Sequence, residues 1–302
     1  MNKPLHHFMK LGTIAFMSYP DIMKGEGPVE ESIRKIVNDP DFTAIELTWI
    51  KDPAVRARVK KLLDASLIDV CYGAQPRFLT TGMNINDLDE DKRLTALDSL
   101  KQGVNEAYEL GAKGLAFLSG KYEEATKEQS YQALLKSTNE ICAYAAAKGD
   151  LRIELEVFDY DVDKKSIIGP TLYAKQFAED VLKNHKNFGL LVDLSHFPLI
   201  RETVAESVYP ISDYITHAHI GNAVVVPGAP AYGDAHPRFG FPNSANTEAD
   251  AVEYLRALLE IGFLNEENPP VLSFEVKPFG DEDADAVLAG CKRFLEAAWA
   301  KV

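Results

Sequence analysis

Short β-type runs alternate with longer helical segments along the whole chain, and this alternation most limits its fold. Runs rich in β-branched and aromatic residues are typical of strands, and apolar spacing near 3.6 residues is typical of amphipathic helices. Strands are expected at residues 11–17, 42–48, 67–73, 114–118, 151–157, 188–193, 214–219 and 270–276. Helices are expected near residues 28–38, 53–65, 88–110, 123–148, 170–184, 247–262 and 281–300, with a shorter one near 200–208.

This pattern predicts a single (β/α)8 TIM barrel over residues 1–302, because the βα repeats follow one another without a linker or low-complexity tract. Gly111 and Gly149 lie where helix C-caps are expected, and Thr247-Glu-Ala-Asp resembles a capping box. A doubly wound sheet is the alternative. Such a sheet usually has a glycine-rich phosphate loop after its first strand, whereas here Tyr19-Pro-Asp follows.

The composition narrows the class of protein. A chain of 302 residues that is 46% hydrophobic can bury a substantial core. The net charge of −14 argues against binding to a nucleic-acid backbone, which depends on Lys and Arg. Three scattered cysteines and the lack of a long apolar run indicate reduced thiols and no membrane helix. We therefore expect a cytoplasmic protein with neither a nucleic-acid nor a membrane partner.

Four of the expected strands end in a residue that can bind a metal ion. These residues are Glu156, Asp193, His219 and Glu275. The carboxyl ends of the strands meet at one mouth of a barrel, so the four side chains are candidates for one metal site. The alternative is that each acid caps a neighbouring helix or pairs with a lysine.

The donor set favours a hard or borderline divalent cation. Three carboxylates and one imidazole suit Mn²⁺, Mg²⁺ or Co²⁺, and the histidine also admits Zn²⁺ or Fe²⁺. Three carboxylates at close range would repel one another without a cation. We expect Mn²⁺ as the cofactor.

Residues two apart on a strand share a face, so Glu154 accompanies Glu156 and His217 accompanies His219. Glu156 and His219 lie nearer the carboxyl mouth and are the preferred ligands. Glu154 and His217 are expected one layer deeper, where we hypothesise that they contact each other.

The loops after the sixth and seventh strands carry further candidates. His196 could donate a hydrogen bond to a substrate oxygen or act as a general acid/base, or it could be a surface histidine. In the loop from Gly221 to about Asn246, Asp234-Ala-His236 could bind metal. His236 and Arg238 could instead hold an anionic or hydroxyl-rich substrate, and a plain structural turn is the alternative.

Three more polar or aromatic residues follow strand ends. Trp49 could stack on a sugar ring or could cover the core. Lys277 shares a face with Glu275, so it could contact substrate or pair with an acid. Gln75, after the third strand, is a weaker candidate for substrate binding.

These motifs together resemble the xylose isomerase-like TIM-barrel superfamily. The resemblance lies in Asp193-Leu-Ser-His196, His217-Ala-His219-Ile-Gly and Ser273-Phe-Glu275-Val, together with Glu156. It implies that Glu156, Asp193, His219 and Glu275 bind the metal and that His196 touches the substrate. It also implies that Glu156 and Glu275 act as paired acid and base on either face of an enediolate.

Two departures from the superfamily pattern limit which activity and substrate contacts the resemblance implies. Endonuclease IV has histidines after its third and fourth strands, where this chain has Gly73-Ala-Gln75-Pro and Leu118-Ser-Gly. Ketose 3-epimerases usually have an arginine soon after the residue that matches His219, and here Gly221-Asn-Ala-Val follows. These differences argue against DNA repair and leave the substrate contacts open.

Two loop sequences, Asp159-Tyr-Asp-Val-Asp-Lys-Lys and Gly233-Asp-Ala-His-Pro-Arg-Phe-Gly, are also similar to the catalytic subunit of bacterial C-glycoside deglycosidases. Those enzymes are Mn²⁺ lyases of 3-keto-glycosides and work with a small β-rich partner subunit. The sequence thus favours a metal-dependent isomerase or epimerase of a small-molecule sugar, with such a lyase as the alternative. A metal-dependent phosphodiesterase and a non-enzymatic sugar-binding barrel are less favoured, and the exposed helix faces are compatible with a homo-oligomer.

Overall fold

The computed structural model describes residues 3–302, which contain eight parallel strands arranged as a barrel. The strands are β1 (Lys10–Thr13), β2 (Ala44–Leu47), β3 (Asp69–Gly73), β4 (Gly114–Leu118), β5 (Arg152–Glu156), β6 (Phe188–Asp193), β7 (Ile215–Gly221) and β8 (Val271–Glu275). Their order is β1-β8-β7-β6-β5-β4-β3-β2, so strands that follow one another in the chain lie side by side and β8 returns to β1. The predicted (β/α)8 TIM barrel is confirmed.

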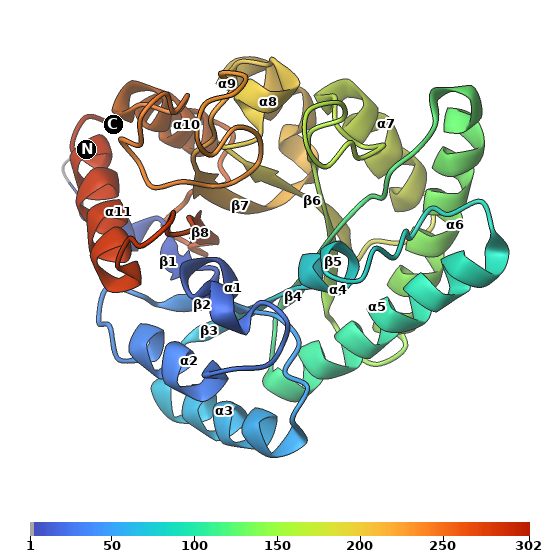
Figure 1. The fold of residues 1–302 in the computed structure, drawn as a ribbon, viewed down its shortest axis with the longest axis horizontal. Coiled ribbons are helices and arrows are strands. Elements are labelled where there is room, and N and C mark those ends of the chain that lie inside the picture. The colour runs from blue at the N-terminus through green and yellow to red at the C-terminus, as the bar shows by residue number, and fades with distance from the viewer. Residues whose placement is uncertain (1–2) are drawn as a thin grey trace.

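Long helices surround the strands, and the short helices α1 and α4 lie near the centre of the view over the strands (Figure 1). The long helices are α2 (Val29–Val37), α3 (Pro53–Ser66), α5 (Glu90–Leu110), α6 (Lys127–Ala146), α7 (Thr171–Leu182), α10 (Glu248–Glu260) and α11 (Ala284–Trp299). The short ones are α1 (Ala15–Ser18), α4 (Gln75–Leu79), α8 (Phe197–Ile200) and α9 (Val204–Val208). Single 3₁₀ turns are η1 (Leu5–His7), η2 (Pro20–Ile22), η3 (Glu124–Thr126) and the longer η4 (Tyr209–Tyr214).

Local sequence accounts for most helix ends. Helix α5 ends at Gly111, whose φ of 81° is the left-handed conformation that glycine adopts easily. Helix α10 begins with a capping box between Thr247 and Asp250, as predicted. The prediction for Gly149 is wrong, because α6 ends at Ala146 with Ala147 as its C-cap. Gly149 instead lies against Tyr108, where an added Cβ would come 2.9 Å from a ring carbon.

The first strand is shorter than the expected run of residues 11–17, and its second half is helical. Residues Ala15–Ser18 form α1, and the Ser18 backbone N–H donates to the Ile14 carbonyl at 2.9 Å. All four residues of α1 are buried. A short, wholly buried apolar segment lacks the polar face that distinguishes a helix from a strand, which explains the error.

Strands β1 and β2 close the barrel through few backbone contacts, which we call the β1–β2 seam. Within residues 3–302, these strands meet through a bridge between Ile14 and Glu46 and a 2.9 Å hydrogen bond from the Thr43 N–H to the Leu11 carbonyl. On the other side, β1 pairs with β8 over four consecutive residues, from Lys10 to Thr13. The seam therefore has fewer backbone hydrogen bonds than the β1–β8 pair.

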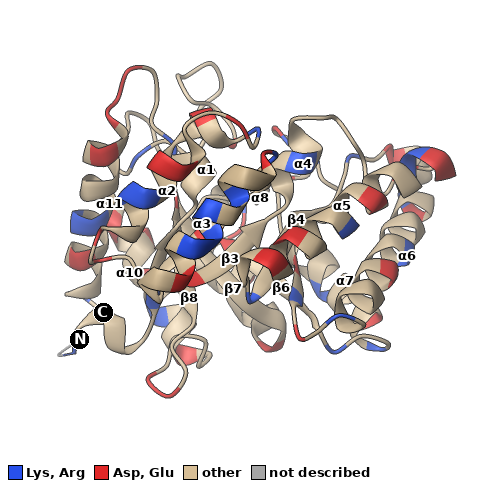
Figure 2. Ribbon diagram, turned by 90° about the horizontal axis from the view of Figure 1, so that it is seen from below, with Lys and Arg blue, Asp and Glu red and all other residues tan. Residues whose placement is uncertain are grey.

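Charged residues of both signs are distributed over the outer helices (Figure 2). No helix in the part of the chain from residue 3 to residue 302 has the length and hydropathy to cross a membrane. The strands themselves are nearly all buried, and so are the polar side chains at their carboxyl ends.

Candidate metal centre

Four side chains from consecutive strands meet at the carboxyl mouth of the barrel. Glu156, Asp193, His219 and Glu275 each place one ligand atom so that all four atoms lie within 4.8 Å of one another. They come from β5, β6, β7 and β8, whose parallel register brings these ends to one level. All four are buried, and only Glu275 has measurable exposure, at 7%.

Neighbouring groups orient these donors toward a common point. Ser195 fixes the Asp193 carboxylate by donating from its backbone N–H at 2.8 Å and from its hydroxyl at 2.6 Å. Gln75 donates from Nε2 to Glu156 Oε2 at 2.7 Å. The other oxygen, Glu156 Oε1, is buried and has no hydrogen-bond partner among residues 3–302, and His219 Nδ1 lies 3.7 Å from it.

These residues fit a divalent cation. A buried carboxylate oxygen without a partner is costly, and a metal ion would satisfy it. Three carboxylates and one imidazole are a donor set suited to Mn²⁺, Mg²⁺, Co²⁺ or Zn²⁺. Glu156, Asp193, His219 and Glu275 would hold the ion.

The pKa shifts in the cluster without a cation also indicate that a cation belongs there. Burial raises the pKa of Asp193, and the nearby Glu275 carboxylate raises it further against the opposing effect of His196. Burial alone would lower the pKa of His219, but Glu46, Glu156 and Glu275 outweigh burial and raise it well above its usual value. A bound cation would reverse both effects, since it favours carboxylate and neutral imidazole.

A carboxylate that the sequence analysis did not single out supports His219. Glu46, in β2, accepts a hydrogen bond from His219 Nε2 at 3.0 Å and from His217 Nε2 at 2.9 Å through the same oxygen. His219 Nδ1 faces Glu275 Oε2 at 2.9 Å. Because Glu46 takes the proton-bearing Nε2, Nδ1 is the nitrogen left for a metal. The available signal was an acid near the carboxyl end of an apolar strand, the same signal that marked Glu156, Asp193 and Glu275.

The deeper layer below the cluster is also polar. His217 Nδ1 lies 2.9 Å from Glu154 Oε2, so the expected contact between these two residues is confirmed. Thr216 donates to the other Glu154 oxygen at 3.0 Å. Glu154, His217, Glu46 and His219 thus form one chain of hydrogen bonds that crosses the barrel interior.

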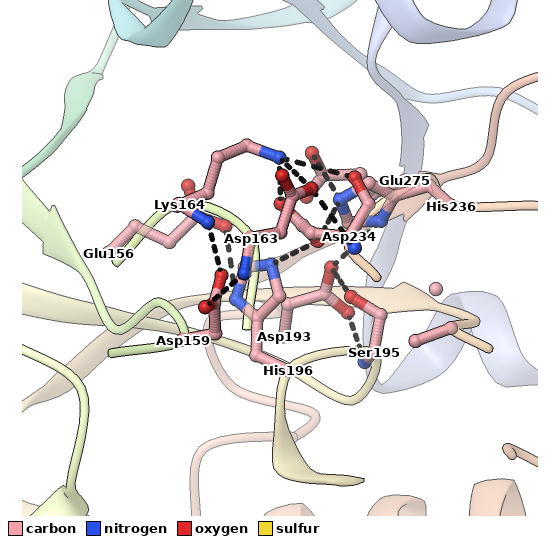
Figure 3. Close-up of polar contacts among 12 residues, drawn as sticks. Glu156, Asp159, Asp163, Lys164, Asp193, Ser195, His196, Asp234, His236 and Glu275 are labelled. Carbon is pink, nitrogen blue, oxygen red and sulfur yellow. Dashed lines mark hydrogen bonds and ion pairs between the residues drawn. The ribbon is translucent and has the colours of Figure 1, made fainter. Parts of the chain in front are cut away.

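A second group lies beside the first and shares Asp193 with it. Asp193, His196 and His236 also place ligand atoms within 4.8 Å of one another. Asp234 Oδ1 lies 3.1 Å from His196 Nε2 and 2.8 Å from His236 Nε2 (Figure 3). Asp234 and His236, from the loop after β7, therefore contact His196, from the loop after β6.

Lys164 neutralises this second group. Its Nζ lies 2.7 Å from Asp234 Oδ2, and its side chain is 18% exposed. Burial lowers the pKa of Lys164, but Asp234 and Asp163 outweigh burial and raise it above its usual value. Burial likewise lowers the pKa of His196, and Asp234, Asp193 and Glu156 raise it to about 10. An ammonium group at Asp234 supplies the positive charge that a second cation would otherwise bring.

The loop after β5 holds Lys164 in this position. The Asp159 carboxylate, fully buried, accepts backbone N–H groups of Val162, Asp163 and Lys164 at 2.8, 2.7 and 2.7 Å. Lys164 was missed because its role depends on this turn. Its strongest sequence signal was its place in the acidic stretch that follows the fifth strand.

Hydrogen bonds at both ends also order the long loop after β7. The Asn246 side chain donates to the carbonyls of Leu194 and Gly221 at 2.7 and 3.1 Å, and its N–H donates to Asn222 at 3.0 Å. The carbonyl of His236 accepts the N–H of Lys277 at 2.7 Å, which ties the loop to the end of β8. His236 itself has a φ of 49°, a conformation that non-glycine residues rarely adopt.

A cavity of about 380 Å³ opens above the cluster. Its polar wall consists of Glu46, Gln75, Lys121, Asp163, Lys164, Asp234, His236, Glu275 and Lys277. Much of its apolar wall consists of Ile14, Phe16, Met17, Met23, Leu79 and Phe158. His236 Nδ1 is buried without a hydrogen-bond partner within the described part of the chain. This nitrogen lies 3.7 Å from Asp193 Oδ2, so the cavity wall at His236 borders the metal cluster directly.

The sequence-derived candidates fall into two groups. The structure brings Gln75, His236 and Lys277 to the cavity, whereas His196 lies beside the cluster with both ring nitrogens engaged, Nδ1 at 2.8 Å from the Val157 carbonyl. The residues lining the cavity include neither Trp49 nor Arg238.

Trp49 and Arg238 each have other partners. Trp49 donates to the Met23 carbonyl at 3.1 Å, and the Arg77 guanidinium lies 5.2 Å from its ring centre. Arg238 pairs with Glu282 at 2.7 Å and lines a separate cavity of about 630 Å³ against α11. A role for either residue in substrate binding stays an untested prediction.

Solved structures with a similar fold include several named as sugar epimerases. D-allulose 3-epimerase from Methylomonas sp. in complex with D-allulose has a TM-score of 0.74 and 18% identity, covering 96% of this chain and 97% of that chain. D-psicose 3-epimerase with D-tagatose from Clostridium cellulolyticum H10 has a TM-score of 0.67 and 17% identity, covering 97% of each chain. The 3-keto-D-glucoside 4-epimerase from E. coli has a TM-score of 0.66 and 15% identity, covering 95% of this chain and 98% of that chain.

A search of curated proteins gives no match. The family model described as xylose isomerase-like TIM barrel matches residues 35–296, which is most of the chain. This chain belongs to the xylose isomerase-like TIM-barrel family.

Proposed function

We propose that this protein is a divalent-metal-dependent isomerase or epimerase of a sugar or keto-sugar, with Mn²⁺ as its metal. The observation that carries the proposal is the convergence of Glu156, Asp193, His219 and Glu275 beside a cavity of about 380 Å³. The names of similarly folded structures, which include ketose 3-epimerases and a 3-keto-glucoside 4-epimerase, point the same way.

We assign proton transfer to the two glutamates, Glu156 and Glu275. When bound, the metal would polarise the substrate carbonyl and stabilise the negative charge that develops on its oxygen. Glu275 lines the cavity, and Gln75 orients the Glu156 carboxylate by donating to Oε2. One glutamate removes the proton alpha to the carbonyl, and the other returns a proton to the opposite face or to the neighbouring carbon.

Other residues hold the substrate and exclude water. His236, Gln75 and Lys277 line the cavity, and we assign them to contacts with substrate hydroxyls. His196 acts through Asp234, which it helps to orient. Phe16 and Phe158 form part of the apolar wall and reduce the access of water to the reacting carbon.

Deuterium incorporation tests this function. The Mn²⁺-loaded protein is incubated with ketohexoses and 3-keto-glucosides in D₂O and followed by NMR. We expect deuterium at the carbon alpha to the carbonyl with the substituents retained, and no incorporation with Glu156→Gln or Glu275→Gln. Glu266→Gln, which changes an exposed glutamate paired with Lys3, serves as the matched control. An absence of exchange over the whole panel would refute the proposal.

The alternative is a Mn²⁺-dependent lyase of 3-keto-glycosides. It begins with the same proton removal and then expels the substituent on the carbon next to the one that lost its proton. The same NMR experiment separates the two, because a lyase releases the substituent as a free molecule.

A further inference from the structure

Lys121 belongs to the wall of the cavity above the metal cluster. It lies three residues beyond the end of β4, whose last residue, Leu118, pairs with Glu156 of β5. Lys121 also lines an adjoining cavity of about 360 Å³, and it shares the dividing wall with Leu79 and Lys164. A ligand that fills the metal cavity therefore contacts the wall to which Lys121 belongs.

The backbone of Lys121 is held in place, whereas its ammonium group has no partner. The Lys121 carbonyl accepts hydrogen bonds from the side-chain amides of Asn84 and Asn86, both at 2.9 Å, and Lys121 forms a β-bridge with Ser166. Within residues 3–302, its Nζ has neither a hydrogen bond nor a carboxylate within 4.0 Å. The fold thus fixes the position from which this side chain extends and leaves its charge uncompensated.

The carboxylates of the same cavity wall are already engaged by other groups. Lys164 pairs with Asp163 at 3.0 Å and with Asp234 at 2.7 Å. Glu46 accepts hydrogen bonds from two histidines, and Glu275 belongs to the metal cluster. Since none of these acids is left over for Lys121, a bound ligand is the remaining source of a negative partner inside the cavity.

The surroundings of Lys121 suit a carboxylate better than a phosphate. Phosphate sites usually combine several N–H donors or use a helix N-terminus. Here the neighbouring donors are engaged, because the Gly120 N–H donates to Asn86 Oδ1 at 2.6 Å and two aspartates neutralise Lys164. Asp87, which lines the adjoining cavity, adds a negative charge that disfavours a dianion. One free ammonium group, with three N–H donors, matches a single carboxylate.

Lys277 carries a second unpaired ammonium group of the metal cavity, and it lies on the opposite side. Strands β4 and β8 are four places apart in the order of eight, so the loops that follow them face each other across the mouth. Lys277 is two residues from Glu275, and its N–H donates to the His236 carbonyl, so it belongs to the end of the cavity where the chemistry occurs. Lys121 is then placed to hold the other end of a substrate.

We propose that Lys121 binds a carboxylate of the substrate, so that the substrate is a keto-sugar acid with its carboxylate at the end of the molecule away from the reacting carbonyl. This inference rests on the proposed function for its reacting carbonyl. A carboxylate at Lys121 also sets the orientation of the sugar, because an inverted molecule would leave the ammonium group facing an uncharged hydroxyl.

Two sugars that differ only at C6 test the proposal. D-fructuronate has a carboxylate at C6 where D-fructose has a CH₂OH group, and both have the carbonyl at C2. Dissociation constants are measured calorimetrically on the Mn²⁺-loaded protein at low and at high ionic strength. We expect D-fructuronate to bind about tenfold more tightly at low salt, the effect of one hydrogen bond between charged groups. The preference should shrink at high salt, because Lys121 is exposed and its charge is screened.

Substitutions at Lys121 assign the preference to this residue. Lys121→Met keeps the apolar stem and the backbone carbonyl, and it should give the two sugars nearly equal dissociation constants. Lys121→Arg keeps the charge and should retain most of the preference. Lys165→Met is the matched control, because it removes the same charge from an exposed lysine that lines neither cavity, and it should leave the preference unchanged. The salt dependence of the wild type needs no variant, so it tests the proposal even if Lys121→Met does not fold.

The outcomes separate this inference from the proposed function. Equal dissociation constants in the wild type, or no detectable binding of D-fructuronate, would overturn the inference. A preference that persists in Lys121→Met would place the carboxylate on the metal and overturn it too, and tighter binding of D-fructose 6-phosphate than of D-fructuronate would overturn the choice of a carboxylate. Deuterium exchange into D-fructose reports on the metal cluster alone. Exchange without a preference would leave the enzyme function standing and reject the role of Lys121, whereas a preference that Lys121→Met removes, without exchange, would do the reverse.

Discussion

Replacing Glu46 by Gln tests whether this buried carboxylate prepares His219 for a metal. One oxygen of Glu46 accepts hydrogen bonds from His219 at 3.0 Å and His217 at 2.9 Å, and the residue is 1% exposed. Glutamine has nearly the same shape, and its amide oxygen can still accept from both ring N–H groups, but it lacks the negative charge. The variant therefore loses the charge that favours the proton on His219 Nε2.

The expected size of the effect follows from the geometry. Carboxylates that hydrogen-bond a metal-binding histidine typically change metal affinity about 10–100-fold when mutated, or about 1.4–2.7 kcal/mol. Hydrogen bonds to charged groups contribute about 1.5–3 kcal/mol, so the metal-free variant should also lose about 2 kcal/mol in its free energy of unfolding. Calorimetric titration with Mn²⁺ measures the first quantity, and urea denaturation of the metal-free protein measures the second.

Glu154→Gln is the matched control. Glu154 belongs to the same hydrogen-bonded chain, but it contacts His217 and Thr216 and makes no hydrogen bond to His219. Its replacement should lower stability comparably and leave Mn²⁺ affinity nearly unchanged. If Glu46→Gln binds Mn²⁺ as tightly as the wild type, Glu46 does not prepare the ligand, and our assignment of Nδ1 to the metal loses its support.

Three further predictions concern metal content, charge compensation and pH. Plasma mass spectrometry after dialysis and Mn²⁺ reloading should find about one metal per wild-type chain and little in His219→Ala; two metals in the wild type would favour the phosphodiesterase hypothesis. Lys164→Met leaves the buried Asp234 uncompensated and should lower the free energy of unfolding by about 3–5 kcal/mol, whereas adding Asp234→Asn should recover part of that loss in a double-mutant cycle. Burial raises the pKa of Asp69, but hydrogen bonds from Lys10 and Lys113 outweigh burial and leave that pKa below its usual value. The Asp69 carboxylate with its two lysines therefore contributes stability above about pH 4, and this stability is lost as the pH falls further. The difference in free energy of unfolding between wild type and Asp69→Asn should shrink from pH 6 to pH 3, and a constant difference would contradict this.

The sequence was sufficient for the barrel because apolar periodicity is a local property. Strands and helices alternate with spacings that can be read within each segment, and parallel strands place their ends at one mouth. That rule was enough to predict that Glu156 and Glu275, far apart in the chain, lie near each other. It failed at residues 15–17, where complete burial removed the polar face that would have indicated a helix.

Contacts across the barrel and within loops depend on information that no single segment contains. Glu46 reaches His219 only because β2 and β7 face each other across the closed barrel. Lys164 reaches Asp234 only because the Asp159 carboxylate shapes the intervening turn. The long loop after β7 carries Arg238 toward α11, although its spacing in the sequence was equally consistent with a place beside His236.

The β1–β2 seam is the part of the barrel where we expect local opening to occur first. Local opening of a folded protein follows its least protected hydrogen bonds, and this seam joins the first two strands through few of them. Glu46 lies on the seam and is also linked to His219. An ion that binds only the closed arrangement would favour closure by mass action. Metal binding at the carboxyl ends of the strands would therefore also stabilise the β1–β2 contact and keep the barrel closed.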